Sequence, residues 1–188
     1  MSTPLPNLAD LISHITLYNN QHAYRQLFRI LYPPVYRFCY CLLKSRELAE
    51  ETANDVMITL WRNRQKLSEI HNIRVYSFVI ARNLSMNVLN RGIKNQMLSL
   101  DDIKVDIILD TPNPEQLLIN DELKTKLENA TNVLPSRCKL VFKLIKEDGL
   151  SYRETAEILN ISIKTVDAHL VTAVKKLTTI LKKEFRLM

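Results

Sequence analysis

The sequence has little glycine, few cysteines and no long apolar run. Two glycines and seven prolines, set against many Leu, Ile, Lys and Glu residues, favour helices over sheets. Three cysteines (Cys39, Cys41 and Cys138) and four histidines show no metal-ligand spacing and no disulfide framework. We expect no signal peptide, and no run approaches the roughly 18 apolar residues of a membrane span. These absences predict an all-α cytoplasmic protein without a metal or cofactor.

Catalytic patterns are missing as well. The chain contains no Ser-His-Asp order, no glycine-rich phosphate loop and no zinc-type spacing of ligands. We therefore expect no catalytic residues, no enzyme activity and no small-molecule substrate.

Charge divides the chain into three blocks. Residues 1–92 carry eleven Lys/Arg against six Asp/Glu, residues 93–134 carry four against eight, and residues 135–188 again carry eleven against six. Two basic blocks separated by an acidic one predict two nucleic-acid-facing modules. Chance variation of a solvated surface is the alternative. We expect domains at 1–92 and 115–188, joined by an acidic linker at 93–114.

Helical periodicity is clear in the first half of the chain. Asn7 and Asn20 are placed to cap the first two helices. The Pro33–Pro34 pair is expected to end the second helix and to start a third. Two further helices are predicted over residues 45–64 and 75–91. The inward side of the last one is expected to comprise Tyr76, Val79, Ile80 and Leu84.

A helix from Pro135 to Ile145 is predicted to stop at Asp148–Gly149, and the segment after it has the pattern of a helix-turn-helix. Ser151 and Glu154 fit a capping box, Asn160 suits a left-handed turn, and Ser162 can cap a second helix. The buried stripe of that second helix is predicted to be Val166, Leu170, Ala173 and Leu177.

The outer face of this second helix is basic and polar, which suits DNA. The alternative is an ordinary helical hairpin with a solvated face. The candidate DNA-contact residues on and beside the face are Ser162, Lys164, Thr165, Asp167, Ala168, His169, Thr172, Lys175 and Lys176. Val171 also lies on this face.

The segment LAEETANDVMITLW, Leu48 to Trp61, resembles the most characteristic helix of bacterial sigma factors. Its opening Ala-Glu-Glu, its second acid and its Leu-Trp end match the family pattern, whereas Asn54 replaces glutamine and Met57 replaces an aromatic residue. The following run YSFVIARNLSMNVLNR resembles the family's next helix, with Asn87 where aspartate is common. LPSRCKLVFKL and the helix-turn-helix resemble the C-terminal domain. The resemblance spans roughly residues 20–183. No third domain lies between the two modules. The resemblance is therefore to the extracytoplasmic-function (ECF) type of the sigma-70 family.

This resemblance implies a protein that binds core RNA polymerase and helps to melt promoters. The face of this chain that docks on the clamp helices of polymerase would comprise Glu50, Glu51, Asn54 and Asp55, with Val56, Met57 and Leu60 packed beneath it. A solvated face over a core seam is the alternative, and we expect Trp61 to lie in the core. The −10 element would meet Arg74, Arg82 and Arg91 at phosphates, and Asn83 and Asn87 at extruded bases. The C-terminal face would read the −35 element.

Other implications of the resemblance concern the linker and the partners. The linker would thread toward the RNA path, with Asp101, Asp102, Asp106 and Asp110 imitating a nucleic-acid backbone. A membrane-associated anti-sigma factor would restrain the chain, which would be a monomer when free of partners. The runner-up is a transcriptional regulator with a response-regulator-like DNA-binding domain, although residues 1–92 lack a receiver's alternation of strands and helices. A third class is an anti-sigma or adaptor protein that does not touch DNA.

Overall fold

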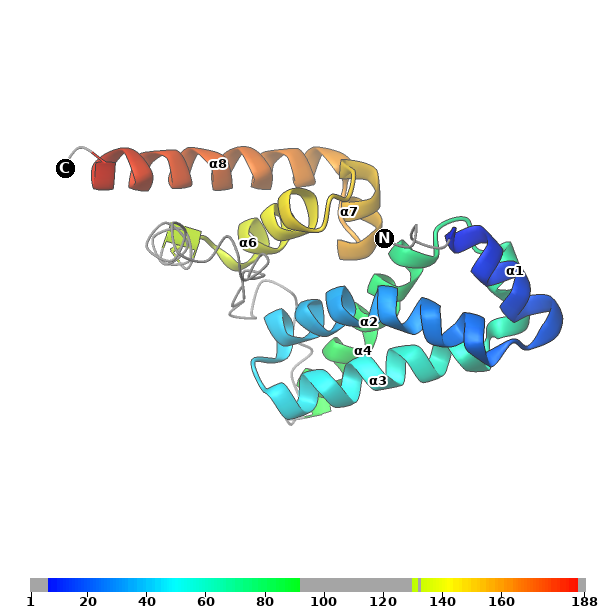
Figure 1. The fold of residues 1–188 in the computed structure, drawn as a ribbon. Coiled ribbons are helices and arrows are strands. Elements are labelled where there is room, and N and C mark those ends of the chain that lie inside the picture. Colours follow the sequence, from blue (N-terminus) through cyan, green and yellow to red (C-terminus); the bar gives the residue numbers. More distant parts are fainter. Residues whose placement is uncertain (1–6, 92–129, 132, 186–188) are drawn as a thin grey trace. The chain divides into compact units, whose positions relative to one another are not determined.

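The computed structural model describes residues 7–91, 130–131 and 133–185 (Figure 1). The chain divides into two compact units, Met1–Gly92 and Ile93–Met188, which are described separately below. The predicted acidic linker at 93–114 and the first residues of the predicted second domain, 115–129, lie outside the described residues.

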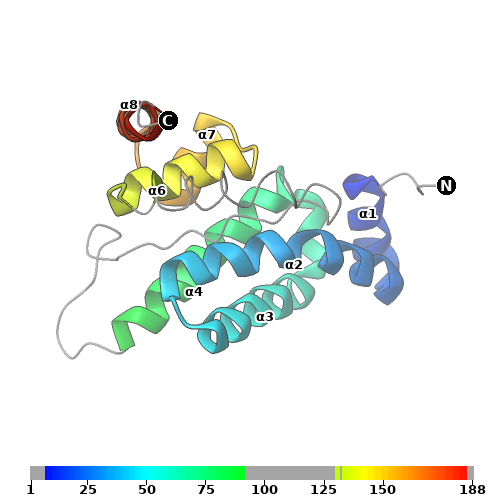
Figure 2. The same cartoon turned by 60° about the vertical axis from the view of Figure 1, so that its left-hand side comes forward.

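The first unit is a packed group of helices. α2 packs against α1, α3 and α4, and it runs beside α3 in both Figure 1 and Figure 2. A 3-10 helix, η1, follows α3 and packs against α1. The elements of this unit are α1 (Leu8–Tyr18), α2 (Gln21–Leu43), α3 (Arg46–Arg62), η1 (Arg64–Glu69) and α4 (Ile73–Arg91).

Side-chain caps begin the first three helices, as the sequence predicts. Asn7 Oδ1 accepts from the Ala9 N–H at 3.1 Å, and Asn20 Oδ1 accepts from the His22 N–H at 2.9 Å. Ser45 Oγ accepts from the Leu48 N–H at 3.2 Å. Each contact satisfies a backbone donor that has no partner within the first turn, so these three helix starts are fixed by local chemistry.

The predicted helix break at Pro33–Pro34 is wrong, because α2 continues through both prolines from Gln21 to Leu43. Proline removes a backbone donor and crowds the preceding turn, which favours a break. Here the neighbouring turns carry Leu31 and Val35, which are buried in the core, whereas Pro33 is exposed. Packing of the apolar side therefore keeps the helix continuous and leaves the missing donor on the solvent side.

The predicted inward face of α4 is not its most buried line, although Tyr76 and Ile80 do pack against the core. Tyr76, Val79, Ile80 and Leu84 are only half-buried. The fully buried line along this helix comprises Val75, Phe78, Ala81 and Ser85. α4 packs against both α2 and α3 and is apolar on more than one side, so periodicity alone does not identify the most buried line. The Phe78 ring meets that of Phe38 edge-on, with centroids 5.2 Å apart.

The second unit contains α6 (Ser136–Phe142), a π-helical turn η3 (Lys143–Glu147), α7 (Tyr152–Leu159) and α8 (Ile163–Phe185). α8 packs against both α6 and α7. The helix predicted from Pro135 is present, but its second half is a π-helical turn. This turn ends before Gly149, whose φ of +67° lies in the left-handed region. Within that turn Lys143 is only 1% exposed, and its Nζ lies 2.8 Å from Glu147 Oε2 and 3.6 Å from Asp148 Oδ2.

Candidate functional site

The helix-turn-helix of the second unit is built by local hydrogen bonds. The Glu154 N–H donates to Ser151 Oγ at 3.2 Å, and the Ser151 N–H donates to Glu154 Oε2 at 2.7 Å, which completes the predicted capping box. Asn160 ends α7 in the left-handed region, at φ 54° and ψ 50°. Ser162 Oγ then accepts from the Thr165 N–H at 3.0 Å and caps α8.

The side of α8 that faces the core is the predicted stripe. Val166, Leu170, Ala173 and Leu177 are all buried. Because this stripe holds α8 against α6 and α7, the opposite side of the helix faces solvent. The exposed residues among the candidate DNA contacts are Ser162, Lys164, Asp167, Ala168, Thr172, Lys175 and Lys176.

Two candidates are placed differently from the rest. Thr165 is half-buried, and its hydroxyl lies 2.7 Å from that of Ser162. His169 is half-buried on the flank of α8, where its Nδ1 lies 3.7 Å from Cys138 Sγ of α6. Burial raises the pKa of the Cys138 thiol, while the charge of Lys176 opposes this shift. The structure therefore does not bring His169 together with the exposed set.

Most of the candidate residues on α4 lie on or beside one face of the helix, whereas Arg74 lies apart from them. Asn83, Asn87 and Arg91 are exposed and follow at four-residue spacing, which places them along one side of the helix. The guanidinium of Arg82 donates to Asn83 Oδ1 through Nε at 3.2 Å and Nη2 at 2.7 Å. Burial lowers the pKa of Arg82. Arg74 lies nine residues before Asn83, about two and a half turns at roughly 3.6 residues per turn, and so on the opposite side.

The predicted docking helix, α3, has an acidic exposed face. Its exposed polar residues include Glu50, Glu51, Asn54 and Asp55. By contrast, Val56, Met57 and Leu60 have exposures of 0%, 2% and 0%, so they support the face from below and belong to the core. Sequence reasoning missed Ile58, which is 46% exposed. Its spacing of four from Asn54 and seven from Glu51 could have placed it on this face.

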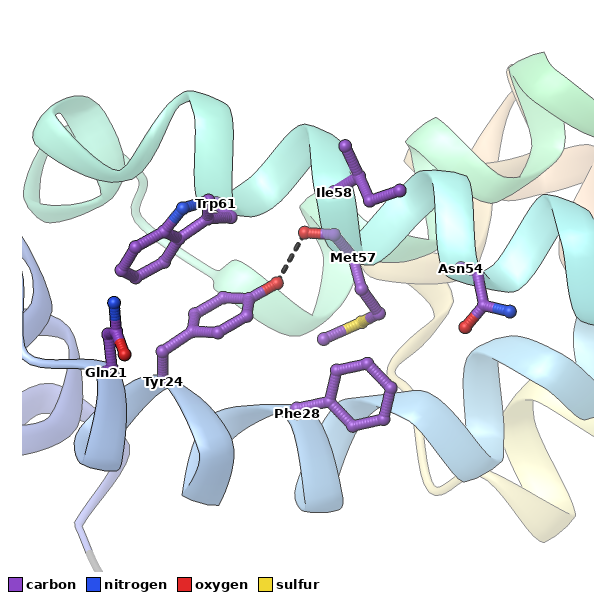
Figure 3. Close-up of a pocket in the computed structure, with 7 residues that line it drawn as sticks. All are labelled: Gln21, Tyr24, Phe28, Asn54, Met57, Ile58 and Trp61. Atoms are coloured by element: carbon purple, nitrogen blue, oxygen red, sulfur yellow. Dashed lines mark hydrogen bonds between the residues drawn. The ribbon is translucent and has the colours of Figure 1, made fainter.

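Beside this acidic face, a groove of about 500 Å³ runs between α2 and α3 (Figure 3). Its lining is mostly apolar and comprises Gln21, Tyr24, Phe28, Asn54, Met57, Ile58 and Trp61. The hydroxyl of Tyr24 donates to the backbone oxygen of Met57, which joins the two helices across the groove (Figure 3).

Trp61 packs against the core, as expected, but it is only half-buried and also forms one wall of the groove. Its ring lies 4.8 Å from that of Tyr24, between centroids. The Arg64 guanidinium carbon lies 4.7 Å from the Trp61 ring centroid. The indole is therefore fixed by two neighbours while one part of it still faces the groove.

Metal binding and membrane crossing have no support among the described residues. No group of three or more His, Cys, Asp or Glu side chains that could hold a metal ion is present among them. Within the same residues, no helix has both the length and the apolar character that crossing a membrane requires.

Two family profiles match this sequence in the places where these surfaces lie. Residues 27–92 match Sigma-70 region 2, and residues 124–177 match Sigma-70 region 4. Together the two matches cover more than half of the chain. The chain belongs to the sigma-70 family.

Individual relatives agree with this family assignment. The sequence is 25% identical over 154 residues to the ECF RNA polymerase sigma factor SigW of Bacillus subtilis, covering 78% of this chain and 82% of that protein. It is 26% identical over 132 residues to the ECF RNA polymerase sigma factor SigE of Mycolicibacterium smegmatis, covering 70% of this chain but only 51% of that protein.

A solved structure shows the same fold. The sigma factor RpoE of Bartonella quintana, crystallised with the anti-sigma factor NepR, is similar with a TM-score of 0.60 and 19% identity. The similarity covers 85% of this chain and 96% of that chain.

Proposed function

We propose that this ECF sigma factor binds core RNA polymerase through the acidic face of α3 and contacts promoter DNA through α4 and α8. It directs polymerase to specific promoters and assists their melting. The observation that carries the proposal is that one chain combines an acidic, exposed helix face in its region 2 unit with a capped helix-turn-helix in its region 4 unit. The polymerase itself performs nucleotide transfer, so the sigma factor needs no catalytic group.

The exposed face of α3 suits a basic partner. Glu50, Glu51 and Asp55 bring three exposed carboxylates to one helix, whose backbone is held in place by buried residues on its other side. Complementary charge of this kind speeds association and sets the orientation of docking.

The exposed side of α4 suits single-stranded DNA at the −10 element. Asn83 and Asn87 lie one turn apart and offer both donors and acceptors to base edges, while Arg91 offers a charge to a phosphate. Arg82 already holds Asn83 through two hydrogen bonds, which orients the amide of that side chain.

The exposed side of α8 suits the major groove of the duplex −35 element. Lys164, Lys175 and Lys176 can neutralise phosphates, and the small Ala168 permits a close approach to a thymine methyl group. A helix-turn-helix places its second helix in the major groove in this way. The cap at Ser162 fixes the start of that helix.

Two properties of the sigma factor follow from the proposal. Its place of action is the cytoplasm, where polymerase and promoter DNA are found. An anti-sigma factor is a partner that binds the region 2 or region 4 surfaces. The RpoE–NepR complex is a precedent, because RpoE has the same fold and is bound there to an anti-sigma factor. The response-regulator alternative is not favoured, because residues 7–91 form α-helices and a 3-10 helix.

The deciding experiment is run-off transcription across a pool of genomic promoter fragments with core polymerase, with and without the purified chain. The expected result is a set of defined starts that need both components. Their shared upstream sequence would give the −10 and −35 elements. Absence of new starts, together with tight duplex binding by the chain alone, would contradict the proposal and favour a conventional regulator.

A further inference from the structure

On the exposed side of α4, one asparagine has its amide held from a single direction. The Arg82 guanidinium donates to Asn83 Oδ1 twice, through Nε at 3.2 Å and through Nη2 at 2.7 Å. Arg82 is half-buried, whereas Asn83 is exposed. Hydrogen bonds from a charged donor are stronger than those between neutral groups, so the guanidinium is an effective anchor for the amide.

This contact decides which end of the amide faces outward. An asparagine amide taken alone offers an acceptor oxygen and a donor nitrogen of nearly the same shape. A guanidinium carries only donors, so the oxygen of Asn83 must be the end that faces Arg82, because a reversed amide would point donors at donors. The two N–H groups of Arg82 also engage both lone pairs of Oδ1. The Nδ2 end, with its N–H donors, is therefore the end that meets a ligand.

An asparagine that can only donate reads bases differently from an unconstrained one. The common contact of asparagine with adenine is bidentate, with the amide oxygen accepting from N6 and the amide nitrogen donating to N7. The first half of that contact needs the oxygen that Arg82 already occupies. Donation from Nδ2 to a carbonyl oxygen or ring nitrogen is unaffected. Adenine thus loses part of its pairing with Asn83, whereas a base read through its acceptors alone loses nothing.

Asn87 provides a comparison within the same helix. It is exposed and lies one turn beyond Asn83 on the same side of α4. Nε and Nη2 of Arg82 are engaged at Asn83, so they impose no polarity on the amide of Asn87. That amide can turn either end toward a base and can make the bidentate contact with adenine. The two asparagines therefore differ in the bases that they accept.

We propose that Arg82 is a positioning residue for promoter recognition: it holds the Asn83 amide with its donors outward, so that Asn83 selects an extruded base by its acceptor atoms and discriminates against adenine. This rests on the proposed function, in which Asn83 meets the −10 strand, and deepens it by assigning the class of base. Arg82 acts through Asn83 and needs no base contact of its own.

The test measures base preference in the holoenzyme. Core polymerase with the full chain or a variant binds forked promoter fragments whose −10 element is unpaired and randomised, and sequencing of the bound fraction gives relative affinities for the bases at each position. Unpaired fragments remove the energy of melting from the comparison. Asn83→Ala and Asn87→Ala each identify the position that the asparagine reads. A ratio between bases does not depend on the folded fraction, so a purely structural role of Arg82 would not change it.

Arg82→Met removes the donors and keeps an unbranched side chain. We expect it to raise the affinity for adenine, relative to the other bases at the Asn83 position, by about threefold or more, as for one hydrogen bond gained. The preference at the Asn87 position should not change. Arg91→Met, which removes a proposed phosphate contact from the same helix, should weaken binding equally for all bases. A wild-type preference for adenine at the Asn83 position, or an unaltered preference there in Arg82→Met, would overturn the inference.

Asn83→Asp tests the same polarity without altering Arg82. The carboxylate keeps an oxygen for the guanidinium and presents a second oxygen outward, where the wild-type chain presents donors. We expect the preference at this position to move by about threefold or more toward bases with an exocyclic amino group. Retention of the wild-type preference would show that the outward end of the amide is not its donor end, and would also overturn the inference.

The outcomes distinguish this inference from the proposed function. If the wild-type holoenzyme selects a −10 sequence and Arg82→Met selects the same one, the sigma-factor function stands and the positioning role of Arg82 is wrong. If Asn83→Ala changes the preference at no position, the base contact of Asn83 is wrong and the inference falls with it, while the function again stands. If the wild-type holoenzyme selects no promoter sequence at all, the proposed function and the inference both fail.

Discussion

The indole of Trp61 packs on the phenol of Tyr24, with ring centroids 4.8 Å apart and planes inclined by 55°. This contact joins α3 to α2 at one end of the groove. Trp61 is the single tryptophan of the chain, so its fluorescence reports on the region 2 unit alone. The arrangement makes the groove wall both a structural contact and a built-in probe.

Arg64→Ala should destabilise the region 2 unit. The substitution removes the cation–π contact with Trp61 and the hydrogen bonds to Asn19 Oδ1 and to the Trp61 backbone oxygen. We expect the free energy of unfolding to fall by about 1–2 kcal/mol. Urea denaturation followed by Trp61 fluorescence measures it. Arg62→Ala, at the exposed last position of α3, is the matched control, and an equal loss there would contradict the assignment.

Ser151→Ala should loosen α7, the first helix of the helix-turn-helix. It leaves the Glu154 N–H without its acceptor and breaks the reciprocal box, at a cost of about 1 kcal/mol. Hydrogen exchange of the α7 amides in the full chain should become faster. Ser13→Ala is the control, because that hydroxyl donates to the Ala9 backbone oxygen within α1 and caps nothing. Unchanged protection of α7 in Ser151→Ala would show that packing alone holds this helix.

Glu51→Lys and Asp55→Lys should weaken binding to core polymerase while the fold is retained. Both side chains are exposed, so their replacement reverses charge on the docking face and leaves the core intact. We expect the double variant to lose about tenfold or more in affinity at low salt. Glu69→Lys, exposed in η1, makes the same change of charge as either single substitution but outside α3, and it should leave the affinity unchanged. If the double variant keeps wild-type affinity, the acidic face of α3 is not the docking face.

Lys164→Ala and Lys175→Ala should weaken promoter binding by the holoenzyme and reduce its dependence on salt. Each lysine that neutralises a phosphate contributes about one to the slope of log affinity against log salt concentration. The double variant should therefore lose about two from that slope. Lys66→Ala, exposed in η1 of the other unit, should leave it unchanged. An unaltered slope in the double variant would move the phosphate contacts to another surface.

Stability should fall at alkaline pH because of Cys39. Burial raises the pKa of this thiol from its ordinary value of 9.0 to about 12, so between these values the folded state keeps a proton that the unfolded state has lost. The stabilisation is complete below pH 9 and is lost as the pH rises toward 12, with a slope of up to about 1.4 kcal/mol per pH unit.

Cys39→Ala should make this dependence shallower. The measurement is urea denaturation at several values between about pH 8 and about pH 10. Burial also raises the pKa of Tyr24, to about 12. This residue remains in the variant and contributes a slope of the same sign. An identical slope in Cys39→Ala and wild type would show that the thiol does not titrate with unfolding.

Much of the fold follows from local patterns in the sequence. The caps at Asn7, Asn20 and Ser45, the Ser151–Glu154 box and the left-handed Asn160 all involve residues within a few positions of one another. Such contacts depend on residue type and spacing, which is why the helix starts and the helix-turn-helix are predictable. The stripe of α8 follows for the same reason, since one helix with one apolar side has one way to face the core.

Other features depend on contacts between elements that are distant in the sequence. The continuity of α2 through Pro33 is maintained by buried neighbours on either side. The half-buried Trp61 needs Tyr24 from another helix. The burial of Lys143 depends on a π-turn that brings Glu147 and Asp148 to its ammonium group. None of these can be derived from the periodicity of a single helix.

The sequence by itself determined the helical class, the caps, the helix-turn-helix and the position of the acidic residues on α3. Tertiary structure alone decided which side of α4 is buried, that His169 turns toward Cys138, and that Ile58 borders a groove between α2 and α3. The physical reason is that caps and stripes arise within one helix, whereas a groove, its rigid walls and the burial of a second apolar face exist only once several helices pack together.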